Sequence, residues 1–351
     1  MTPSDSAPLR QGTVVWFGLS LILFAVLAIA GSWLAGGEDV WQSFASVPLI
    51  TVLGMLFLSL VNYLFRAIRW HICSLVIGVE VPFRRDLTYY IAGFALTMTP
   101  GKIGEAFRLY LLKKNHGYAY GQTAALALTD RLADAVALLV LCIIGLSYFT
   151  AQSWLIVGAF ALLAVPMLIV AAPKMAEQVL LRLMIMMRAP RRLRDFGVQT
   201  MRQIAAISDW RVLFLTLILG VAGWLAEAYA LSLVLSALGA DIPLAACAFI
   251  FAASALAGAL VLLPGGLGGT EASMVGLLVL SGVDMGAAVA ATGLIRLTTL
   301  WFATGLGLIA LPMAFDFSSI KAALKAPRLA PRAGRLSLAL RNARRIRQPA
   351  R

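Results

Sequence analysis

The sequence predicts an all-α, polytopic integral membrane protein with about eight transmembrane helices. Three observations lead to this fold class. Hydrophobic residues make up 61% of the 351-residue chain and charged residues 13%, whereas soluble domains are nearer half apolar and a quarter charged. Several apolar stretches reach the roughly 20 residues that a helix needs to cross a bilayer. Two glycine- and proline-rich breaks also interrupt such stretches in matching places, which is typical of transporters.

Seven stretches are apolar enough to be straightforward spans. They are residues 14–36, 47–66, 121–149, 153–172, 211–236, 243–263 and 286–314. The first is too long for the apolar region of a signal peptide, so we interpret it as a retained span. Residues 87–112 and 264–283 are poorer candidates. Pro100-Gly101 cuts the first of them, and glycines and prolines crowd the start of the second.

Basic residues indicate which segments face the cytoplasm. The net charge of +13 is concentrated in the loop 173–210 and in the tail 316–351, and basic segments beside spans stay on the cytoplasmic side. The rule predicts a cytoplasmic N-terminus (1–13), a single membrane domain (14–315), a re-entrant segment at 87–112, a crossing segment at 264–283 and a cytoplasmic tail. Two alternatives stay open. If both broken segments are re-entrant, the tail ends outside, and if both cross, the basic loop lies outside.

The two breaks belong to a longer repeated pattern. It consists of a Pro-Gly break, a Gly-x-x-x-Gly pair, and an arginine fourteen positions after the first glycine of that pair. The copies comprise residues 99–105 with Gly117, Gly121 and Arg131, and residues 263–271 with Gly282, Gly286 and Arg296. Such paired breaks point to a transporter-type site between inverted repeats. We expect the halves at roughly 47–172 and 211–315.

Each break can serve as a hinge and as the start of a new helix, whose bare N–H groups attract anions. Lys102 adds a positive charge at the first break, and Arg108 follows Glu105 within one turn. Glu105 and Glu271 lie near the start of the helix that follows each break, where a carboxylate can cap it. A plain kink with a carboxylate cap is the alternative to an anion site. The predicted hinge residues are Pro100, Gly101, Gly104, Pro264, Gly265, Gly266, Gly268 and Gly269.

Charged residues inside the predicted spans indicate either structural ion pairs or a polar path. A charge at mid-bilayer costs about 2.5–3.5 kcal/mol on insertion scales, so it faces protein or water. Asp130 and Asp134 are four apart and share one helix face; this pair calls for a cation, which Arg131 or Arg296 could supply. Glu227 is the most deeply placed acid in the chain.

Arg66 and Arg69 lie one turn apart at the end of the second predicted span. They serve either as interfacial anchors or as a headgroup-binding pair. The predicted substrate-binding residues are Arg66, Arg69, Lys102, Arg108, Arg131 and Arg296. The residues predicted to balance these charges or carry coupled protons are Glu105, Asp130, Asp134, Glu227 and Glu271.

Other functional classes lack sequence support. The chain has no P-loop and no Gly-x-Ser-x-Gly motif, and its two histidines and three scattered cysteines give neither metal-ligand spacing nor a disulfide framework. We therefore expect no catalytic residue, metal or cofactor. We also expect no nucleic-acid partner, because basic loops beside membrane spans need no such explanation.

Four of these motifs resemble the flippase-like membrane region of lysylphosphatidylglycerol synthases. They are Arg-Ala-Ile-Arg-Trp at 66–70, Pro-Gly-Lys-Ile-Gly-Glu-Ala-Phe-Arg at 100–108, Asp-Arg-Leu-Ala-Asp at 130–134 and Leu-Pro-Gly-Gly-Leu-Gly-Gly-Thr-Glu at 263–271. The resemblance covers roughly residues 14–315 and implies a multi-pass protein of the bacterial inner membrane that handles lipids. The full-length synthases continue into a soluble aminoacyl-transfer domain. Here a short basic tail follows instead, so lipid aminoacylation is not implied.

Together these features predict a flippase-like transporter for anionic or polyprenyl-phosphate lipids. Two alternatives remain at this point. One is an enzyme that acts within the bilayer on a lipid-linked sugar. The other is an accessory subunit of a lipid-biosynthesis complex (hopanoid, glycolipid or aminoacyl-lipid) that docks through its basic tail.

Overall fold

The computed structural model describes residues 22, 26, 37–99, 103–148, 173–261 and 263–315. The predicted N-terminal segment 1–13, the span 153–172 and the tail 316–351 lie outside these residues, as does all of the span 14–36 except residues 22 and 26. The described part is built from helices and contains no strand, as the sequence predicts.

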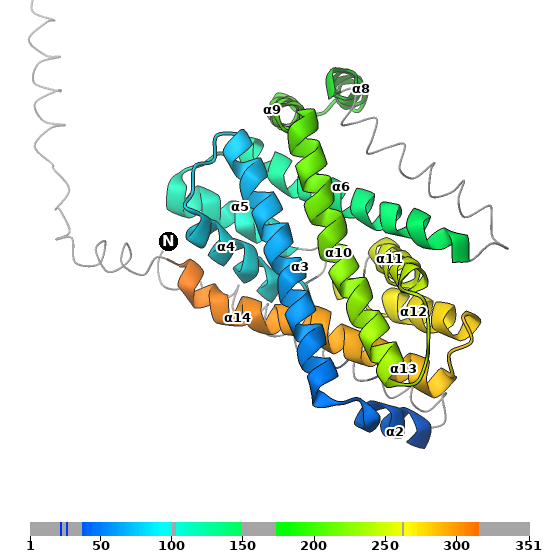
Figure 1. Ribbon diagram of the computed structural model, residues 1–351. Helices are drawn as coiled ribbons and strands as arrows, with labels where there is room; N and C mark the ends of the chain where they lie inside the picture. Colours follow the sequence, from blue (N-terminus) through cyan, green and yellow to red (C-terminus); the bar gives the residue numbers. More distant parts are fainter. Residues whose placement is uncertain are drawn as a thin grey trace, which may run out of the picture. The chain divides into compact units, whose positions relative to one another are not determined.

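The first half contains α2 (Glu38–Ser46), α3 (Leu49–Val76), α4 (Phe83–Ala92), the short η2 (Gly93–Leu96), α5 (Ile103–His116), α6 (Tyr120–Gly145) and the short η4 (Leu146–Tyr148) (Figure 1). The second half contains α8 (Pro173–Met186), α9 (Arg191–Ile207), α10 (Trp210–Ala237), α11 (Leu244–Leu260), η5 (Pro264–Gly266), α12 (Gly269–Leu280), α13 (Met285–Arg296) and α14 (Phe302–Ala314). A π-helical turn, η6 (Leu297–Trp301), joins α13 to α14 in one continuous rod.

Three of these rods are long and apolar enough to cross a bilayer: α3, α10 and the continuous α13–α14. Their outer faces agree with this, because the exposed side chains of α3 form an apolar stripe at helical spacing. The stripe consists of Ile50, Leu53, Phe57, Leu60 and Leu64. An apolar surface of this kind suits lipid rather than water. The predicted span 47–66 begins near the observed start of α3, but the helix continues ten residues further, to Val76.

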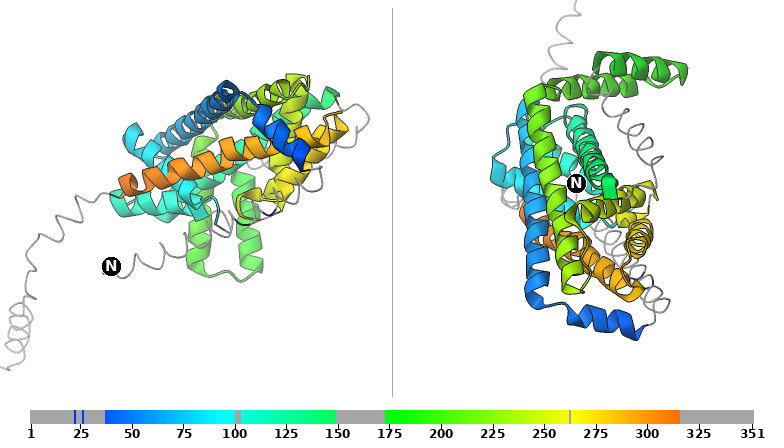
Figure 2. Two further views of the ribbon diagram at one scale, coloured as in Figure 1. Left: turned by 90° about the horizontal axis from the view of Figure 1, so that it is seen from below. Right: turned by 45° about the vertical axis from the view of Figure 1, so that its right-hand side comes forward.

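The helices α3 and α10 lie side by side and run in opposite directions (Figure 1). The close approaches show this: Gly54 faces Leu233, while Asn62 faces Gly223 and Arg69 faces Gly220. As residue numbers rise along one helix, they fall along the other. Helix α2 lies at one end of this pair, and the α8–α9 pair lies at the other end (Figure 2).

The chain contains two copies of one arrangement of helices. A 28-residue helix (α3 or α10) ends before a left-handed glycine, Gly78 (φ 75°) or Gly239 (φ 78°), and four residues later Pro82 or Pro243 starts the next helix. Two helices joined by a break follow, and then a long rod, α6 or α13–α14. Since α3 and α10 are antiparallel, the copies are related as the inverted repeat predicts.

In each copy the break joins two helices into a hairpin that is pinched by glycines. A Cβ atom on Gly104 would lie 2.3 Å from the carbonyl oxygen of Gly93, and a Cβ atom on Gly258 would lie 1.9 Å from Oγ1 of Thr270. Gly93 and Gly258 are separated in the sequence by the same number of positions as Gly104 and Gly269. The repeat therefore extends to the close contacts inside the hairpins, which we name the first hairpin (α4, η2 and α5) and the second hairpin (α11 and α12).

Each copy's long rod packs against the other copy's hairpin. The end of α6 contacts α11, where Gly145 approaches the backbone of Ala245. The end of α14 contacts α4 and η2, where Gly307 approaches the backbone of Ala95. This reciprocal packing brings each hairpin against the long rod of the other copy.

At the second break the structure differs from the sequence-based prediction. Residues 264–283 were predicted to cross the membrane after a full span at 243–263. Helix α12 has 12 residues and rises about 18 Å, which is short of the roughly 30 Å hydrocarbon core. It packs against α11, so the two segments form a hairpin equivalent to the first one and not two separate crossings.

Candidate functional site

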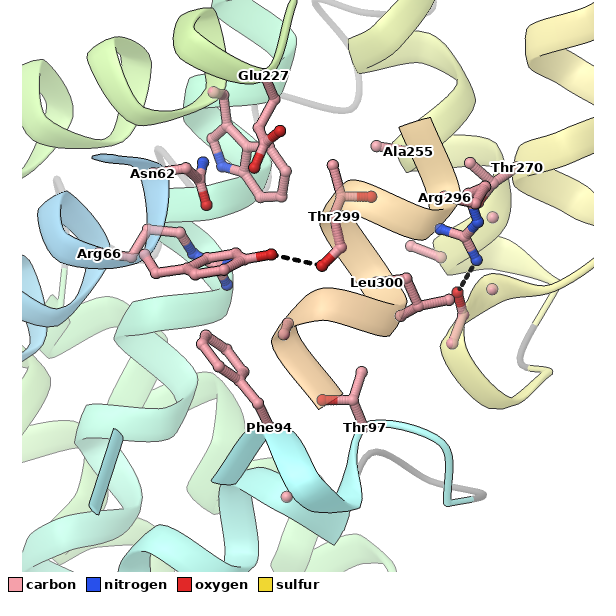
Figure 3. Close-up of a pocket in the computed structure, with 18 of the residues that line it drawn as sticks. Asn62, Arg66, Phe94, Thr97, Glu227, Ala255, Thr270, Arg296, Thr299 and Leu300 are labelled. Carbon is pink, nitrogen blue, oxygen red and sulfur yellow. Dashed lines mark hydrogen bonds between the residues drawn. The ribbon is translucent and has the colours of Figure 1, made fainter. Parts of the chain in front are cut away.

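A cavity of about 230 Å³ lies between the two copies. The first hairpin contributes Gly104 and Glu105 to its wall, and the second contributes Gly265, Gly266 and Thr270. Side chains from α3, α10 and the π-helical turn complete the wall, as Figure 3 shows. The cavity thus lies where the repeat predicted a site.

Arg66 and Arg69 lie inside α3 and reach two aspartates on α6. An Nη2–Oδ distance of 2.7 Å joins Arg66 to Asp134, and another of 2.7 Å joins Arg69 to Asp134. Arg69 also forms a short ion pair with Asp130. All four residues are buried, Arg69 with 1% of its surface exposed. This contact excludes an interfacial anchoring role for the two arginines.

The partners of the aspartates therefore differ from the expected ones. Arg131 was predicted as a counter-ion and contributes a longer contact, 3.8 Å from its Nη1 to Oδ2 of Asp134. Arg296, the other predicted cation, pairs elsewhere. The main cations come from α3, which the sequence could not place beside α6.

Arg108, on α5, extends the network from the first hairpin. Its Nη1 lies 3.6 Å from Oδ2 of Asp130. Its guanidinium carbon lies 3.7 Å from the centre of the Tyr90 ring and 5.4 Å from those of Trp70 and Phe94. Cation–π attraction of this kind stabilises a buried positive charge.

Each break carries the same ion pair, between its glutamate and the arginine of the following rod. At the first break, Glu105 Oε1 lies 2.7 Å from Nε of Arg131. At the second, Glu271 Oε1 lies 2.6 Å from Nε of Arg296. Arg131 keeps 37% of its side chain exposed, against 9% for Arg296. The repeated motif of the sequence therefore forms the same ion pair in both copies. The arginine of this pair is partly exposed in the first copy and buried in the second.

Side chains of Glu271 and Arg296 hold the backbone of the second break through hydrogen bonds. Glu271 Oε2 accepts a hydrogen bond of 2.7 Å from the backbone N–H of Gly268, so this glutamate caps α12 as predicted. Arg296 also donates to the carbonyl oxygen of Gly265 at 2.7 Å (Figure 3). The hinge residues Gly104, Pro264, Gly265, Gly266, Gly268 and Gly269 are described in the structure, whereas Pro100, Gly101 and Lys102 lie outside the described residues.

Glu227 lies in the middle of α10 with 1% of its surface exposed. Ser59 donates a hydrogen bond of 3.1 Å to its Oε2. Tyr63, which also lines the cavity, donates to the backbone carbonyl of Thr299 in the π-helical turn. A π-helical turn inside an α-helix is often found at functional sites.

Several residues of the site were not predicted from the sequence. They are Ser59, Asn62, Tyr63, Trp70, Tyr90 and Trp224. A signal existed on α3, where Ser59, Asn62, Arg66 and Arg69 follow one another at intervals of three or four and so share one face. Trp224 lies three residues before Glu227 and donates to Asp134 at 3.2 Å.

The described residues offer no metal centre, since no three His, Cys, Asp or Glu side chains come together there as metal ligands would. Cys73, Cys142 and Cys247 are buried and free. The arrangement can instead hold an anion, because arginine side chains from several helices line a small and otherwise largely apolar cavity.

The sequence model of the family described as the lysylphosphatidylglycerol synthase TM region matches residues 15–307 of the chain. The chain belongs to this family. It is also similar to a UPF0104 membrane protein of the archaeon Methanothermobacter thermautotrophicus, with 27% identity over 326 residues that cover 84% of this chain and 95% of the relative. A second match to a UPF0104 membrane protein of that organism has 37% identity over 102 residues, 29% of this chain and 30% of the relative.

The segments that carry the family resemblance meet at the cavity. Residues 66–70 and 130–134 supply the buried arginine–aspartate network, and residues 263–271 supply the second break. The described part of residues 100–108 supplies Glu105 and Arg108. Membership of the family is therefore reflected in one site and not only in hydrophobic pattern.

Proposed function

We propose that this membrane protein moves a phosphate-bearing lipid between the leaflets of the bacterial inner membrane. The observation that carries the proposal is the cavity between the two copies, with Arg66, Arg108, Arg131 and Arg296 on its wall. Planar guanidinium groups bind phosphate oxygens through paired, charge-assisted hydrogen bonds. The arginines that line the cavity come from both copies, and two of them pair with the glutamates that follow the breaks. A headgroup bound in the cavity would therefore contact both copies, which we expect to move relative to each other.

The cavity volume indicates which part of a lipid would enter. About 230 Å³ is less than the roughly 300 Å³ at which pockets for drug-sized ligands begin. A polar headgroup fits in this space and two acyl chains do not. The chains would therefore stay in the bilayer while the headgroup passes through the protein.

The two hairpins supply the moving parts. Each is joined to its long rod by an ion pair, and each is pinched by glycines at its break. A headgroup phosphate that competes for Arg131 or Arg296 would loosen the link from Glu105 or Glu271. Rocking of one repeat against the other around a fixed site is how inverted-repeat transporters give alternating access.

The equivalence of the hairpins supports a proposal for how the chain lies in the membrane. With the basic α8–α9 pair in the cytoplasm, α6 leads away from that side and α10 does too, so the second hairpin enters from the outer side. The rod α13–α14 then returns, and the basic tail 316–351 is cytoplasmic. This gives six spans, counting 14–36 and 153–172 from the sequence, plus two hairpins. In this topology both broken segments can be re-entrant while the tail remains cytoplasmic.

This topology predicts that the equivalent turns before the two hairpins face opposite sides. The first hairpin carries Arg84, Arg85, Lys113 and Lys114, whereas α11 and α12 contain no lysine or arginine. In spheroplasts, a membrane-impermeant maleimide should label Asp241→Cys, and should label Glu80→Cys only after the membrane is opened. The native cysteines are buried and serve as the unlabelled background. Labelling of both turns from the outside would contradict the topology.

Loss of the more exposed arginine should slow lipid movement. We expect Arg131→Ala to reduce the initial rate of fluorescent phospholipid movement in proteoliposomes about ten- to a hundredfold, because a charged hydrogen bond contributes about 1.5–3 kcal/mol. Arg202→Ala is the matched control, since Arg202 lies on α9 with 72% of its side chain exposed. An unchanged rate in folded Arg131→Ala protein would remove this residue from the site. A chemically altered lipid product would favour an enzyme instead.

A further inference from the structure

The carboxylates around the cavity fall into two groups. Asp130, Asp134, Glu105 and Glu271 each have an arginine nitrogen at 2.7 Å or closer. Glu227 differs, because no basic group among the described residues lies at salt-bridge distance from it, and its hydrogen bond comes from the neutral hydroxyl of Ser59. A buried carboxyl without a paired cation is one whose charge can change at modest cost.

The groups that line the cavity together with Glu227 come from several elements. Helix α3 presents Ser59, Tyr63 and Arg66, and α11 presents only apolar side chains, Phe251 and Ala255. The π-helical turn presents Thr299, whose carbonyl already accepts from Tyr63. Asp134 on α6 accepts a hydrogen bond from Trp224, and Glu105, Arg108, Arg131 and Arg296 also line the cavity. Arg66, the basic neighbour on α3, is already paired with Asp134.

Among the arginines and acids named here, leaving out Asp86, which pairs with His71, the formal charges balance only when Glu227 is ionised. Five arginines take part: Arg66, Arg69, Arg108, Arg131 and Arg296. They face the four paired carboxylates, and Glu227 is the fifth acid. When Glu227 is protonated, the described site therefore carries one positive charge in excess. Uncompensated charge in a low-dielectric interior is costly, so a single negative charge from outside would restore the balance.

Two unpaired donors show where that negative charge would bind. Nδ2 of Asn62 and Nε of Arg66 are both buried and without a hydrogen-bond partner, although their side chains line the cavity. Asn62 is 1% exposed. Figure 3 shows both residues on the side of the cavity where Glu227 lies. Buried donors without partners are costly unless a ligand satisfies them.

We propose that Glu227 binds one proton whenever a monoanionic phospholipid headgroup occupies the cavity, so that lipid and proton cross the membrane together. This inference rests on the proposed function and adds its energy source. The proton bonds to a carboxylate oxygen of Glu227 as the phosphodiester enters. It returns to water on the opposite side when the lipid leaves and the site regains its own charge balance.

The first test measures protons at binding and does not depend on transport. Purified protein in detergent is mixed with dihexanoyl-phosphatidylglycerol in weakly buffered solution containing a pH indicator. Wild-type protein should take up protons as it binds this lipid, up to about one proton per lipid where Glu227 of the empty site is ionised. Dihexanoyl-phosphatidylcholine, which has no net charge, should cause no uptake.

Glu227→Gln is the deciding variant. The amide keeps the size of the side chain and an acceptor for Ser59, but it cannot exchange a proton. It should bind dihexanoyl-phosphatidylglycerol with no proton uptake at any pH. Glu80→Gln is the matched control, because Glu80 is exposed in the turn before the first hairpin, and it should behave as wild type. Equal proton uptake by Glu227→Gln and wild type would overturn the proposal.

The second test measures coupling across the membrane. Fluorescent phosphatidylglycerol is placed in the outer leaflet of proteoliposomes under a gradient of about one pH unit, a tenfold ratio of proton activity. Inward movement should be faster when the outside is acidic than when the inside is acidic, and Glu227→Gln should not distinguish the two directions. If wild-type protein moves lipid at the same rate under both directions of the pH gradient, the proposed coupling is wrong, although lipid movement itself is supported. If wild-type protein moves no lipid at all, the proposed function fails, and the detergent measurement still decides whether Glu227 binds a proton with the anion.

Discussion

Asp134→Ala should reduce the free energy of unfolding by about 3–5 kcal/mol, the largest effect we expect from removal of a single side chain. Asp134 binds Arg66 and Arg69 at 2.7 Å and accepts from Trp224 at 3.2 Å. Without Asp134, the buried guanidinium groups of Arg66 and Arg69 lose a carboxylate partner, and burying their charge becomes more costly. A denaturant titration of the purified protein in mild detergent, followed by tryptophan fluorescence, measures the change.

Glu177→Ala is the control for Asp134→Ala. Glu177 pairs with Arg202 at 3.7 Å, and 72% of that arginine side chain is exposed. Solvent screens such a pair, so its loss should change the free energy of unfolding by about 0–1 kcal/mol. Asp134→Asn should lie between the two, because the amide still accepts from Trp224 but brings no charge. If Asp134→Ala and Glu177→Ala unfold alike, the network does not hold α3 against α6.

Gly104→Ala should destabilise the first hairpin by about 1–3 kcal/mol or more, as overpacking of a tight contact does. The added methyl group would lie 2.3 Å from the carbonyl oxygen of Gly93. That neighbour is backbone and cannot rotate away as a side chain can. The hairpin would have to open, which would displace Glu105 and Arg108 from the cavity. We therefore expect both the unfolding free energy and lipid movement to fall in the same titration and proteoliposome assays.

Gly276→Ala is the matched control for this substitution. Gly276 lies inside α12, and a Cβ atom there would meet nothing within 4 Å. Alanine in an open helix position should be neutral or stabilising by about 0.5–1 kcal/mol, because glycine is a poor helix residue. A Gly104→Ala protein as stable and active as Gly276→Ala would show that the close crossing is not required.

The sequence was sufficient for the fold class, the breaks and most charged residues of the site. Composition alone requires membrane helices, and the paired breaks indicate where two distant segments meet. The glutamates and arginines that follow the breaks are repeated in the sequence, and the structure shows them as two equivalent ion pairs. Each of these features depends on local spacing or on comparison of two segments, which a single sequence contains.

The partners of Asp130 and Asp134 could not be read from the sequence. They come from α3, and only the packing of α3 against α6 and α10 brings Arg66 and Arg69 to these aspartates. The hairpin nature of residues 243–283 was missed for a related reason. A hydropathy profile detects only that an apolar segment is long enough to cross a bilayer. The contact between α11 and α12 depends instead on glycines on both sides of the break, which allow the two helices to pack closely against each other.

The copies differ in length by four residues between the starting proline and the pinching glycine. Pro82 precedes Gly93 in the first copy, and Pro243 precedes Gly258 in the second. An α-helix has about 3.6 residues per turn, so four added residues lengthen α11 by one turn and leave Gly258 on nearly the same face. Insertions and deletions of about one turn can therefore accumulate in either hairpin during evolution, whereas a change of two residues would rotate the glycine away from its crossing. Relatives should vary in hairpin length by whole turns.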